Sequence, residues 1–266
     1  MLLTGIPRSG STLLLKLITD YKHVVGLDEP NWLKEIRQLS EIDQIPIEMN
    51  RNIEFLREQV YMGKPVYMNF GIGTGELTDN HFCRTENGVI KTKQSQQVIL
   101  DSSTYNKAWV IKSNIFITAL LKQFIHSNYF RVIVTVRDPV AVIKSWRSLN
   151  FSLSRGKSMI AEKFDKASIV KIDTDDVMVK QVLLLDWMFK KYYENINHIS
   201  ILKYEEFIEN PSIIQNTLNF CTVNEKVSLQ SRNDNEIYNH TETNKIKACL
   251  TKYGKYYEYF YSNVGG

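Results

Sequence analysis

The feature that most constrains the fold is a short apolar strand that runs directly into a glycine-containing loop at the amino terminus. The strand is expected at residues 1–4, and the loop follows as Gly5-Ile-Pro-Arg-Ser-Gly10-Ser-Thr. An apolar periodicity begins at once and predicts a helix over residues 11–21. A strand, a glycine loop and a helix N-terminus in this order form a cradle of backbone N–H groups that binds phosphate.

The loop has the outline of the nucleotide-binding motif G-x-x-x-x-G-K-[ST], but it lacks the lysine of that motif. Gly5 and Gly10 are in place, Ser11 stands where the lysine is expected, and Arg8 carries the positive charge inside the loop. Retention of the cradle without the ATP-type lysine favours a different phosphate-bearing donor. An ordinary strand-to-helix turn is the alternative interpretation of these residues taken alone.

A second segment, residues 130–146, repeats the pattern of a buried strand followed by a helix. Residues 132–136 form a β-branched, almost continuous apolar run, which is typical of a strand buried on both faces of a parallel sheet. Arg137 follows at the carboxyl end of that strand, where open α/β sheets bind ligands. The guanidinium of Arg137 and the hydroxyl of Ser145 can together bind one phosphate through hydrogen bonds. A local ion pair of Arg137 and a surface position for Ser145 are the alternative.

Together these motifs resemble those of the sulfotransferases that use 3′-phosphoadenosine 5′-phosphosulfate (PAPS). Residues 4–12 are similar to their 5′-phosphosulfate loop, and Arg137 with Ser145 is similar to their 3′-phosphate site. Residues 201–211 resemble the late strand, Tyr-Glu turn and helix of the family. The Pro-Arg-Ser-Gly form of the loop is closest to tyrosylprotein and bacterial sulfotransferases. The resemblance covers residues 1–30, 108–148 and 198–221, and it fades in 31–107, 149–176 and 222–266.

The resemblance implies an α/β fold of the P-loop-like, three-layer kind, with a central parallel sheet flanked by helices. It implies PAPS as the donor and transfer of its sulfuryl group to a hydroxyl or amine, which leaves adenosine 3′,5′-bisphosphate. Such a transfer needs positioning and charge stabilisation, and no metal is expected. The donor is expected to contact Gly5, Pro7, Arg8, Ser9, Gly10, Ser11, Thr12, Arg137, Ser145, Tyr204 and Lys245.

Two of these donor contacts have open alternatives. Tyr204, in the Tyr-Glu turn, is expected beside the adenine, but a packed core tyrosine explains it equally well. The carboxyl-terminal region is expected to supply a further phosphate contact. Lys245 represents a set of cations among which the sequence does not choose: Arg232, Lys245, Lys247 and Lys252.

Glu29 is the candidate general base that removes the acceptor proton, and Asp28 is its nearest substitute. Glu29 follows a short strand and stands where the tyrosylprotein sulfotransferases place their catalytic glutamate. A helix-capping or first-turn role for this acidic pair is the alternative. The cytosolic animal enzymes use a histidine after Lys-Thr instead. Here Asn114 stands at that place, and the five histidines of the chain are expected to be structural or on the surface.

Lys112 and Arg8 complete the catalytic candidates. Lys112 ends the expected strand 109–112, from which it can reach oxygens of the donor that gain charge during transfer. A solvated lysine just past a strand is the alternative. Arg8 lies in the loop that the resemblance places on the 5′-phosphosulfate.

Strands alternate with helices along the chain, which predicts a parallel sheet with right-handed crossovers. The length of 266 residues suits one domain with insertions. Residues 31–107 are expected to bind the acceptor, residues 70–75 to break regular structure, and residues 149–176 to form an irregular lid. Further strands are expected at 24–27 and 199–203, and helices at 31–39, 47–61, 116–126, 177–195, 212–221 and 244–261.

Residues 28–80 carry ten acidic and five basic side chains, a net charge of −5 in a chain of net charge +4. An acidic wall beside a basic donor site favours a cationic small-molecule acceptor. The alternative is that these acidic side chains only form a solvated helical face. The mild overall charge indicates no nucleic-acid partner, and the apolar runs are too short to span a membrane. The oligomeric state is left open.

The sequence also favours a cytoplasmic enzyme. The first strand begins at Met1, and Cys83, Cys221 and Cys249 lack the spacing of a metal site or a disulfide framework. Two other functions stay open at this point. One is a small-molecule or nucleoside kinase on the same loop architecture, and the other is a nucleotide-binding protein without turnover.

Overall fold

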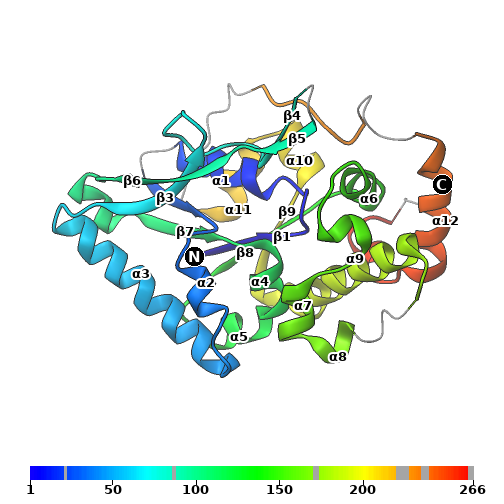
Figure 1. Cartoon of the computed structure of the whole chain (residues 1–266), viewed down its shortest axis with the longest axis horizontal. Coiled ribbons are helices and arrows are strands. Elements are labelled where there is room, and N and C mark those ends of the chain that lie inside the picture. The colour runs from blue at the N-terminus through cyan, green and yellow to red at the C-terminus, as the bar shows by residue number, and fades with distance from the viewer. Residues whose placement is uncertain (21–22, 86–87, 170–173, 220–227, 235–239, 263–266) are drawn as a thin grey trace.

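A five-stranded parallel sheet forms the centre of the molecule, in the order β2-β7-β1-β8-β9 (Figure 1). The computed structural model describes residues 1–20, 23–85, 88–169, 174–219, 228–234 and 240–262. Because all five strands run parallel, their carboxyl ends meet at one edge of the sheet. The strands are β1 (Leu2–Gly5), β2 (Val24–Asp28), β7 (Ala108–Lys112), β8 (Val132–Val136) and β9 (Ile199–Lys203).

Helices cover both faces of this sheet, which confirms the expected three-layer α/β fold. In Figure 1, α1, α10 and α11 lie above the sheet, and α4, α5, α7 and α9 lie below it. The helices of the two layers are α1 (Ser11–Thr19), α4 (Asn114–Ala119), α5 (Leu121–His126), α7 (Met159–Phe164), α9 (Val177–Glu194), α10 (Tyr204–Glu209) and α11 (Ser212–Leu218). The remaining helices are α2 (Leu33–Ile36), α3 (Ile45–Tyr61), α6 (Pro139–Arg147), α8 (Lys166–Ile169) and α12 (Thr243–Tyr253).

The strands next to the loop are buried on both faces. Every residue of β1 and of β8 is buried, which explains why both strands appear in the sequence as unbroken apolar runs. Hydrophobic contacts with the helices on either side hold these strands in place. None of the helices within the described ranges is long and apolar enough to cross a lipid bilayer.

Some predicted helix boundaries are wrong. The helix expected over 116–126 is two helices, because α4 ends at Ala119 and α5 begins at Leu121. The helix expected over 244–261 ends at Tyr253, where Gly254 leaves the helical conformation with ψ of 150°. The helices expected over 11–21 and 212–221 end earlier, at Thr19 and Leu218, and residues 21 and 220–221 lie outside the described ranges. Cys221 also lies outside them, and Cys249 has a free thiol.

Two hairpins were not predicted. Strand β3 (Val66–Gly71) pairs antiparallel with β6 (Lys93–Val98), and β4 (Phe82–Thr85) pairs antiparallel with β5 (Gly88–Lys91). The break in regular structure that the sequence predicts at residues 70–75 therefore begins at Ile72, because β3 includes Phe70 and Gly71. Strand β6 reads Lys-Gln-Ser-Gln-Gln-Val and lacks the apolar alternation that identifies a strand from sequence.

The segment 149–176 is more regular than expected. It contains a 3₁₀ turn at Ser152–Arg155 followed by α7 and α8, and residues 170–173 lie outside the described ranges. The expectation of an irregular segment is therefore wrong for its first part. Its role as a lid, the acceptor-binding role of residues 31–107 and the single domain stay predictions.

The turn from β1 into α1 depends on Gly10. Its φ of 83° lies in the left-handed region. A Cβ atom at this position would lie 2.6 Å from Cδ2 of Tyr204 and 3.1 Å from Cζ of Phe207. Gly10 therefore lets the loop approach α10 closely.

Replacing Gly10 by alanine should lower the free energy of unfolding by about 2–4 kcal/mol, since a left-handed backbone strain and an overpacked contact add together. Gly63→Ala is the matched control. Gly63 has a similar φ of 68°, but nothing lies within 4 Å of a Cβ there, so only the backbone cost of about 1–2 kcal/mol is expected. Urea unfolding measures both losses. Equal losses would show that the Tyr204 side chain moves away from the new methyl group without lowering the free energy of unfolding.

Candidate active site

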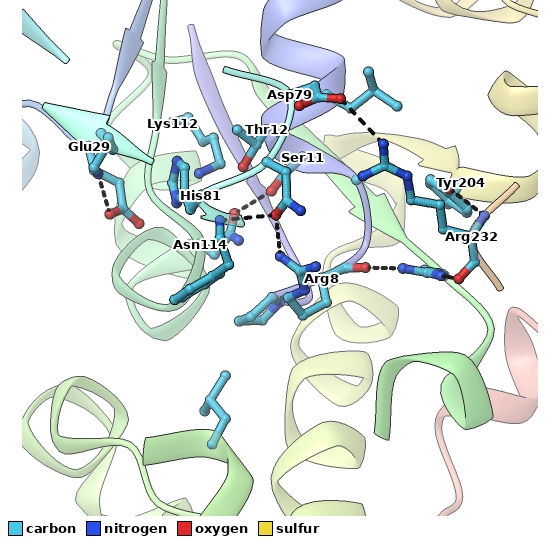
Figure 2. A pocket seen from close by; sticks show the side chains of 18 of the residues that line it. Arg8, Ser11, Thr12, Glu29, Asp79, His81, Lys112, Asn114, Tyr204 and Arg232 are labelled. Atoms are coloured by element: carbon cyan, nitrogen blue, oxygen red, sulfur yellow. Dashed lines mark hydrogen bonds and ion pairs between the residues drawn. The ribbon is translucent and has the colours of Figure 1, made fainter. Parts of the chain in front are cut away.

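A pocket of about 900 Å³ opens at the carboxyl edge of the sheet (Figure 2). Its wall combines the loop before α1, the ends of β2 and β7, residues 79–82 at the start of β4, and residues 228–234. Of the residues expected in the site, those that line this pocket are Pro7, Arg8, Gly10, Ser11, Thr12, Glu29, Lys112, Arg137 and Tyr204. Gly5, Ser9, Ser145 and Lys245 are not among its lining residues.

Arg8 connects the loop to two other parts of the wall. Its Nε donates to Oγ of Ser145 at 3.0 Å, and its Nη1 donates to Oδ1 of Asn80 at 2.7 Å. The backbone of Arg8 has φ of 79°, which is rare for a residue with a side chain. The carbonyl of Pro7 accepts a hydrogen bond of 2.8 Å from the indole of Trp146. The α6 helix therefore fixes the loop through both Ser145 and Trp146.

Gly5 and Ser9 shape the loop from beneath. Ser9 is fully buried, and its hydroxyl donates to the carbonyl of Thr135 at 2.9 Å. A Cβ atom on Gly5 would meet Oγ1 of Thr135 at 2.1 Å, so β1 and β8 approach closely there. Ser145, only 1 % exposed, likewise supports Arg8 from behind. Direct contact of these three residues with a donor stays a prediction.

Asn114 connects the start of α4 to the loop. Its Oδ1 accepts from the hydroxyl of Ser11 at 2.9 Å, and its carbonyl accepts from Thr4. The Thr4 hydroxyl also forms a hydrogen bond of 2.8 Å with the Thr118 hydroxyl, which forms one of 2.7 Å with the Tyr192 hydroxyl. This buried chain of hydroxyl groups holds the first turn of α1 against the sheet.

Asp28 and Lys112 form a buried ion pair at the edge of the sheet. They are register partners on β2 and β7, their charged atoms lie 3.0 Å apart, and their side chains are 2 % and 1 % exposed. Burial favours the neutral acid, but the opposing charge of Lys112 and the hydrogen bond with His81 outweigh it. The pKa of Asp28 is therefore held well below its usual range.

Glu29 turns out of β2 in a strained conformation. Its φ is 44°, and the buried amide of Asn69 holds the turn by donating to the carbonyls of Asp28 and Glu29 at 2.9 and 2.8 Å. Its carboxylate accepts from Nζ of Lys93 at 3.0 Å. Burial acts to raise the pKa of Glu29, but Lys112 and Lys93 lower it to about 2.

Arg137 lies where the sequence predicts it, at the end of β8, and it is only 4 % exposed. Its Nη1 donates to the carbonyl of Arg8 at 2.8 Å, its Nε donates to Oδ1 of Asn233 at 2.7 Å, and its Nη2 donates to the carbonyl of Arg232. The guanidinium also lies 4.5 Å from the centre of the Tyr204 ring. Arg137 therefore joins the loop to the segment 228–234.

Tyr204 and Glu205 fasten the same segment. The Tyr204 hydroxyl accepts from the backbone N–H of Arg232 at 3.0 Å, and Oε1 of Glu205 accepts from the amide of Asn233 at 2.8 Å. The Tyr204 side chain is 3 % exposed and supports Arg137. These contacts give Tyr204 a packing role, and its contact with adenine stays a prediction.

Lys245 is exposed on α12 and does not line the pocket. Of the four cations proposed for the carboxyl-terminal phosphate contact, Arg232 is the one that lines it. Figure 2 shows Arg232 beside Asp79, and their charged atoms lie 3.6 Å apart. The local sequence does not show which of these cations reaches the pocket, because the distance of each from β8 depends on the tertiary path of the chain.

Sequence reasoning missed several residues of the wall. Asn80 and His81 come from the loop that leads into β4, Phe82 begins β4, and Lys93 begins β6. None of them follows a strand of the parallel sheet, so no strand-end signal marks them. The run Thr-Asp-Asn at 78–80 is a turn signal that predicts a surface loop but not its approach to Arg8.

A family model described as the sulfotransferase domain matches residues 1–258. Because this match covers almost the whole chain, the protein belongs to the sulfotransferase family, and it is a transferase that moves a sulfuryl group. The resemblance stated from the three motifs is confirmed. Among curated protein sequences, none matches the chain significantly. No three histidine, cysteine, aspartate or glutamate side chains within the described ranges are grouped as metal ligands.

The buried pair of Asp28 and Lys112 should show strong coupling. Lys112→Met leaves a buried carboxylate without its cation, so we expect a loss of about 3–5 kcal/mol in the free energy of unfolding. Asp28→Asn should lower the free energy of unfolding by a similar amount, because it leaves the buried Lys112 cation without its carboxylate. The double variant should lose clearly less than the sum. Urea unfolding of the four proteins measures this, and additive losses would contradict the coupling.

The same pair sets a pH dependence. The pKa of Asp28 is lower in the folded chain than its ordinary value of 3.8, so its charge stabilises the fold above that pH. This contribution is lost as the pH falls below 3.8 toward the folded pKa. The stability difference between wild type and Asp28→Asn should therefore narrow in acid, and a difference that stays constant would contradict this origin.

Proposed function

We propose that this sulfotransferase moves the sulfuryl group of PAPS to a hydroxyl or amine of a small-molecule acceptor and leaves adenosine 3′,5′-bisphosphate. One observation carries the proposal. Arg137 donates to the carbonyl of Arg8 at 2.8 Å, so the two predicted anion-binding elements meet in one pocket. Two cationic groups on adjoining walls suit a donor with phosphate groups at its 3′ and 5′ positions.

The loop and α1 supply the 5′ side of the proposed donor site. The first-turn N–H groups of α1, at Ser11 and Thr12, have no acceptor within the helix and point out of its N-terminus. Together with Arg8 they offer an anion site at the positive end of the helix dipole. Both hydroxyl-bearing residues line the pocket.

Arg137 and Arg232 supply the 3′ side. Arg137 already donates to Asn233 and to the Arg232 carbonyl, so a 3′-phosphate bound there takes over some of these hydrogen bonds. The segment 228–234 then shifts its contacts when the donor binds. Arg232, 60 % exposed and facing Asp79, is free to turn toward the phosphate at little cost.

The chemistry follows from these charges. The acceptor loses a proton, its oxygen or nitrogen bonds to sulfur, and the bond from sulfur to the 5′-phosphate oxygen breaks with its electron pair. Arg8 and Lys112 supply positive charge beside the leaving phosphate. Glu29 lines the same pocket and stays a candidate for the base.

Apolar side chains support an acceptor with an apolar body. Part of the pocket wall is formed by Phe82, Ile115, Phe116, Phe151, Leu153 and Ile160. Of the ten acidic side chains in residues 28–80, only Glu29 and Asp79 line the pocket, and each is paired with a cation. The cationic acceptor therefore stays a prediction, as do the cytoplasmic location and the lack of nucleic-acid and membrane partners.

Ligand-dependent thermal stability tests the donor assignment. Adenosine 3′,5′-bisphosphate at about 100 times its dissociation constant should add about 2.7 kcal/mol of stability. ATP with Mg²⁺ should add little, because Ser11 replaces the lysine that pairs with the phosphates of ATP. Stabilisation by ATP with Mg²⁺ alone would contradict the proposal. Mass spectrometry for an added sulfuryl group then screens acceptors.

Arg137→Ala should weaken adenosine 3′,5′-bisphosphate by about 1.5–3 kcal/mol, the scale of a hydrogen bond to a charged group. Adenosine 5′-phosphosulfate lacks the 3′-phosphate, so its affinity should change little. Isothermal titration of both ligands makes the comparison within one variant, which removes general effects on folding.

Arg131→Ala is the matched control, because Arg131 precedes the same strand at its opposite end and is exposed. It should leave the affinity of both ligands unchanged. Arg8→Ala should weaken both ligands, since both carry the 5′ group. Equal losses for the two ligands in Arg137→Ala would show that Arg137 does not bind the 3′-phosphate.

A further inference from the structure

His81 and Asp28 form a hydrogen-bonded pair on the wall of the pocket. His81 lies in the loop between β3 and β4, and its carbonyl accepts from the backbone N–H of Thr92 at 3.0 Å. Its Nε2 bonds to Oδ2 of Asp28, and its side chain is 17 % exposed. Figure 2 shows His81 with Lys112 and Glu29 at one side of the pocket, away from Arg232.

The partner of Nε2 determines which ring nitrogen carries the proton. An ionised carboxylate only accepts hydrogen bonds, so Nε2 donates to Asp28 and the neutral ring keeps its lone pair on Nδ1. Within the described residues, Nδ1 has no hydrogen-bond partner. The ring therefore presents a proton acceptor on the pocket wall.

Asp28 is itself fixed. Its second oxygen accepts from Lys112 at 3.0 Å, and the carboxylate is 2 % exposed, so it cannot rotate freely away from the ring. Lys112 also keeps Asp28 ionised. A carboxylate held in this way orients the imidazole and stabilises the cation that forms when Nδ1 takes a proton.

The charges around the ring keep it neutral at pH 7. Burial lowers the pKa of His81, Lys112 and Lys93 lower it further, and Asp28 opposes them. Glu29 is a second carboxylate near this group. Glu29 is paired with Lys93 and has a pKa of about 2, which makes it a much weaker base than an imidazole.

We propose that His81 is the general base of the transfer and that Asp28 positions it. The proposal rests on the proposed function. The acceptor proton moves to Nδ1, the acceptor oxygen bonds to sulfur, and the bond from sulfur to the 5′-phosphate oxygen breaks with its electron pair left on the phosphate. The imidazolium, stabilised by Asp28, then releases its proton to water. Glu29 holds Lys93 in place.

Two phenols of different acidity test this role, with PAPS as the donor. At pH 8, 2-naphthol is protonated and needs a base, whereas 4-nitrophenol is largely ionised and needs none. His81→Gln should lower kcat with 2-naphthol by about 10²–10⁴-fold and should spare turnover of 4-nitrophenol. The control His23→Gln should keep kcat with 2-naphthol near wild type. His23 is exposed and lies at the opposite end of β2.

The pH profile and chemical rescue distinguish a base from a structural residue. Wild-type kcat with 2-naphthol should rise with pH through a group of pKa below 6.5, as His81 loses its proton. That rise should vanish in His81→Gln. Added imidazole should restore turnover to His81→Gly, and no rescue together with an unchanged pH profile would overturn the role.

Nuclear magnetic resonance gives a readout that needs no acceptor. In the complex with adenosine 3′,5′-bisphosphate at pH 7, His81 should carry its proton on Nε2 and none on Nδ1, and a cationic ring would overturn the proposal. A wild-type protein that turns over PAPS while His81→Gln keeps its kcat with 2-naphthol would overturn only the role of His81. A wild-type protein that binds no adenosine 3′,5′-bisphosphate and transfers nothing from PAPS would overturn the proposed function.

Discussion

The ion pair between Asp28 and Lys112 is the interaction on which the rest of the site depends. The register of β2 against β7 sets the two residues opposite each other, and burial of both charges makes either one costly without the other. His81 bonds to the remaining oxygen of Asp28. The turn at Glu29 begins where this pair ends, and its backbone N–H donates to the carbonyl of Lys112 at 2.9 Å. The pairing of β2 with β7 therefore orients Asp28 and Lys112, and it brings His81 and Glu29 beside them.

The other side of the pocket depends on hydrogen bonds to backbone carbonyls. Arg137 joins the loop before α1 to the segment 228–234 through the carbonyls of Arg8 and Arg232. Tyr204 and Glu205 hold that segment from α10. The hydrogen-bond donors of Arg137 are therefore held in fixed positions in the structure, and under the proposed function the 3′-phosphate exchanges hydrogen bonds with protein groups already in place.

The pocket combines residues of family-like and of variable segments, which bears on the acceptor. The loop, Arg137 and Lys112 belong to the segments that resemble other sulfotransferases, whereas His81 and Lys93 come from the two hairpins within 31–107. The two hairpins between β2 and β7 thus add a histidine, a lysine and part of an apolar wall to the pocket that the other segments form. The acceptor specificity of this enzyme is therefore expected to follow the hairpins rather than the sheet.

The sequence by itself determined the parallel sheet, the loop and the placement of Arg137 and Lys112 at strand ends. These features depend on local patterns, because a buried strand is a short apolar run and its next residue lies at the binding edge. Only the tertiary structure decided that Arg232 and not Lys245 reaches the pocket, and that His81 meets Asp28. The strand β6 is polar and pairs with β3 across more than twenty residues of chain, so no local pattern announces it. Contacts made by such pairing depend on register and loop path, which a single sequence does not encode in any short segment.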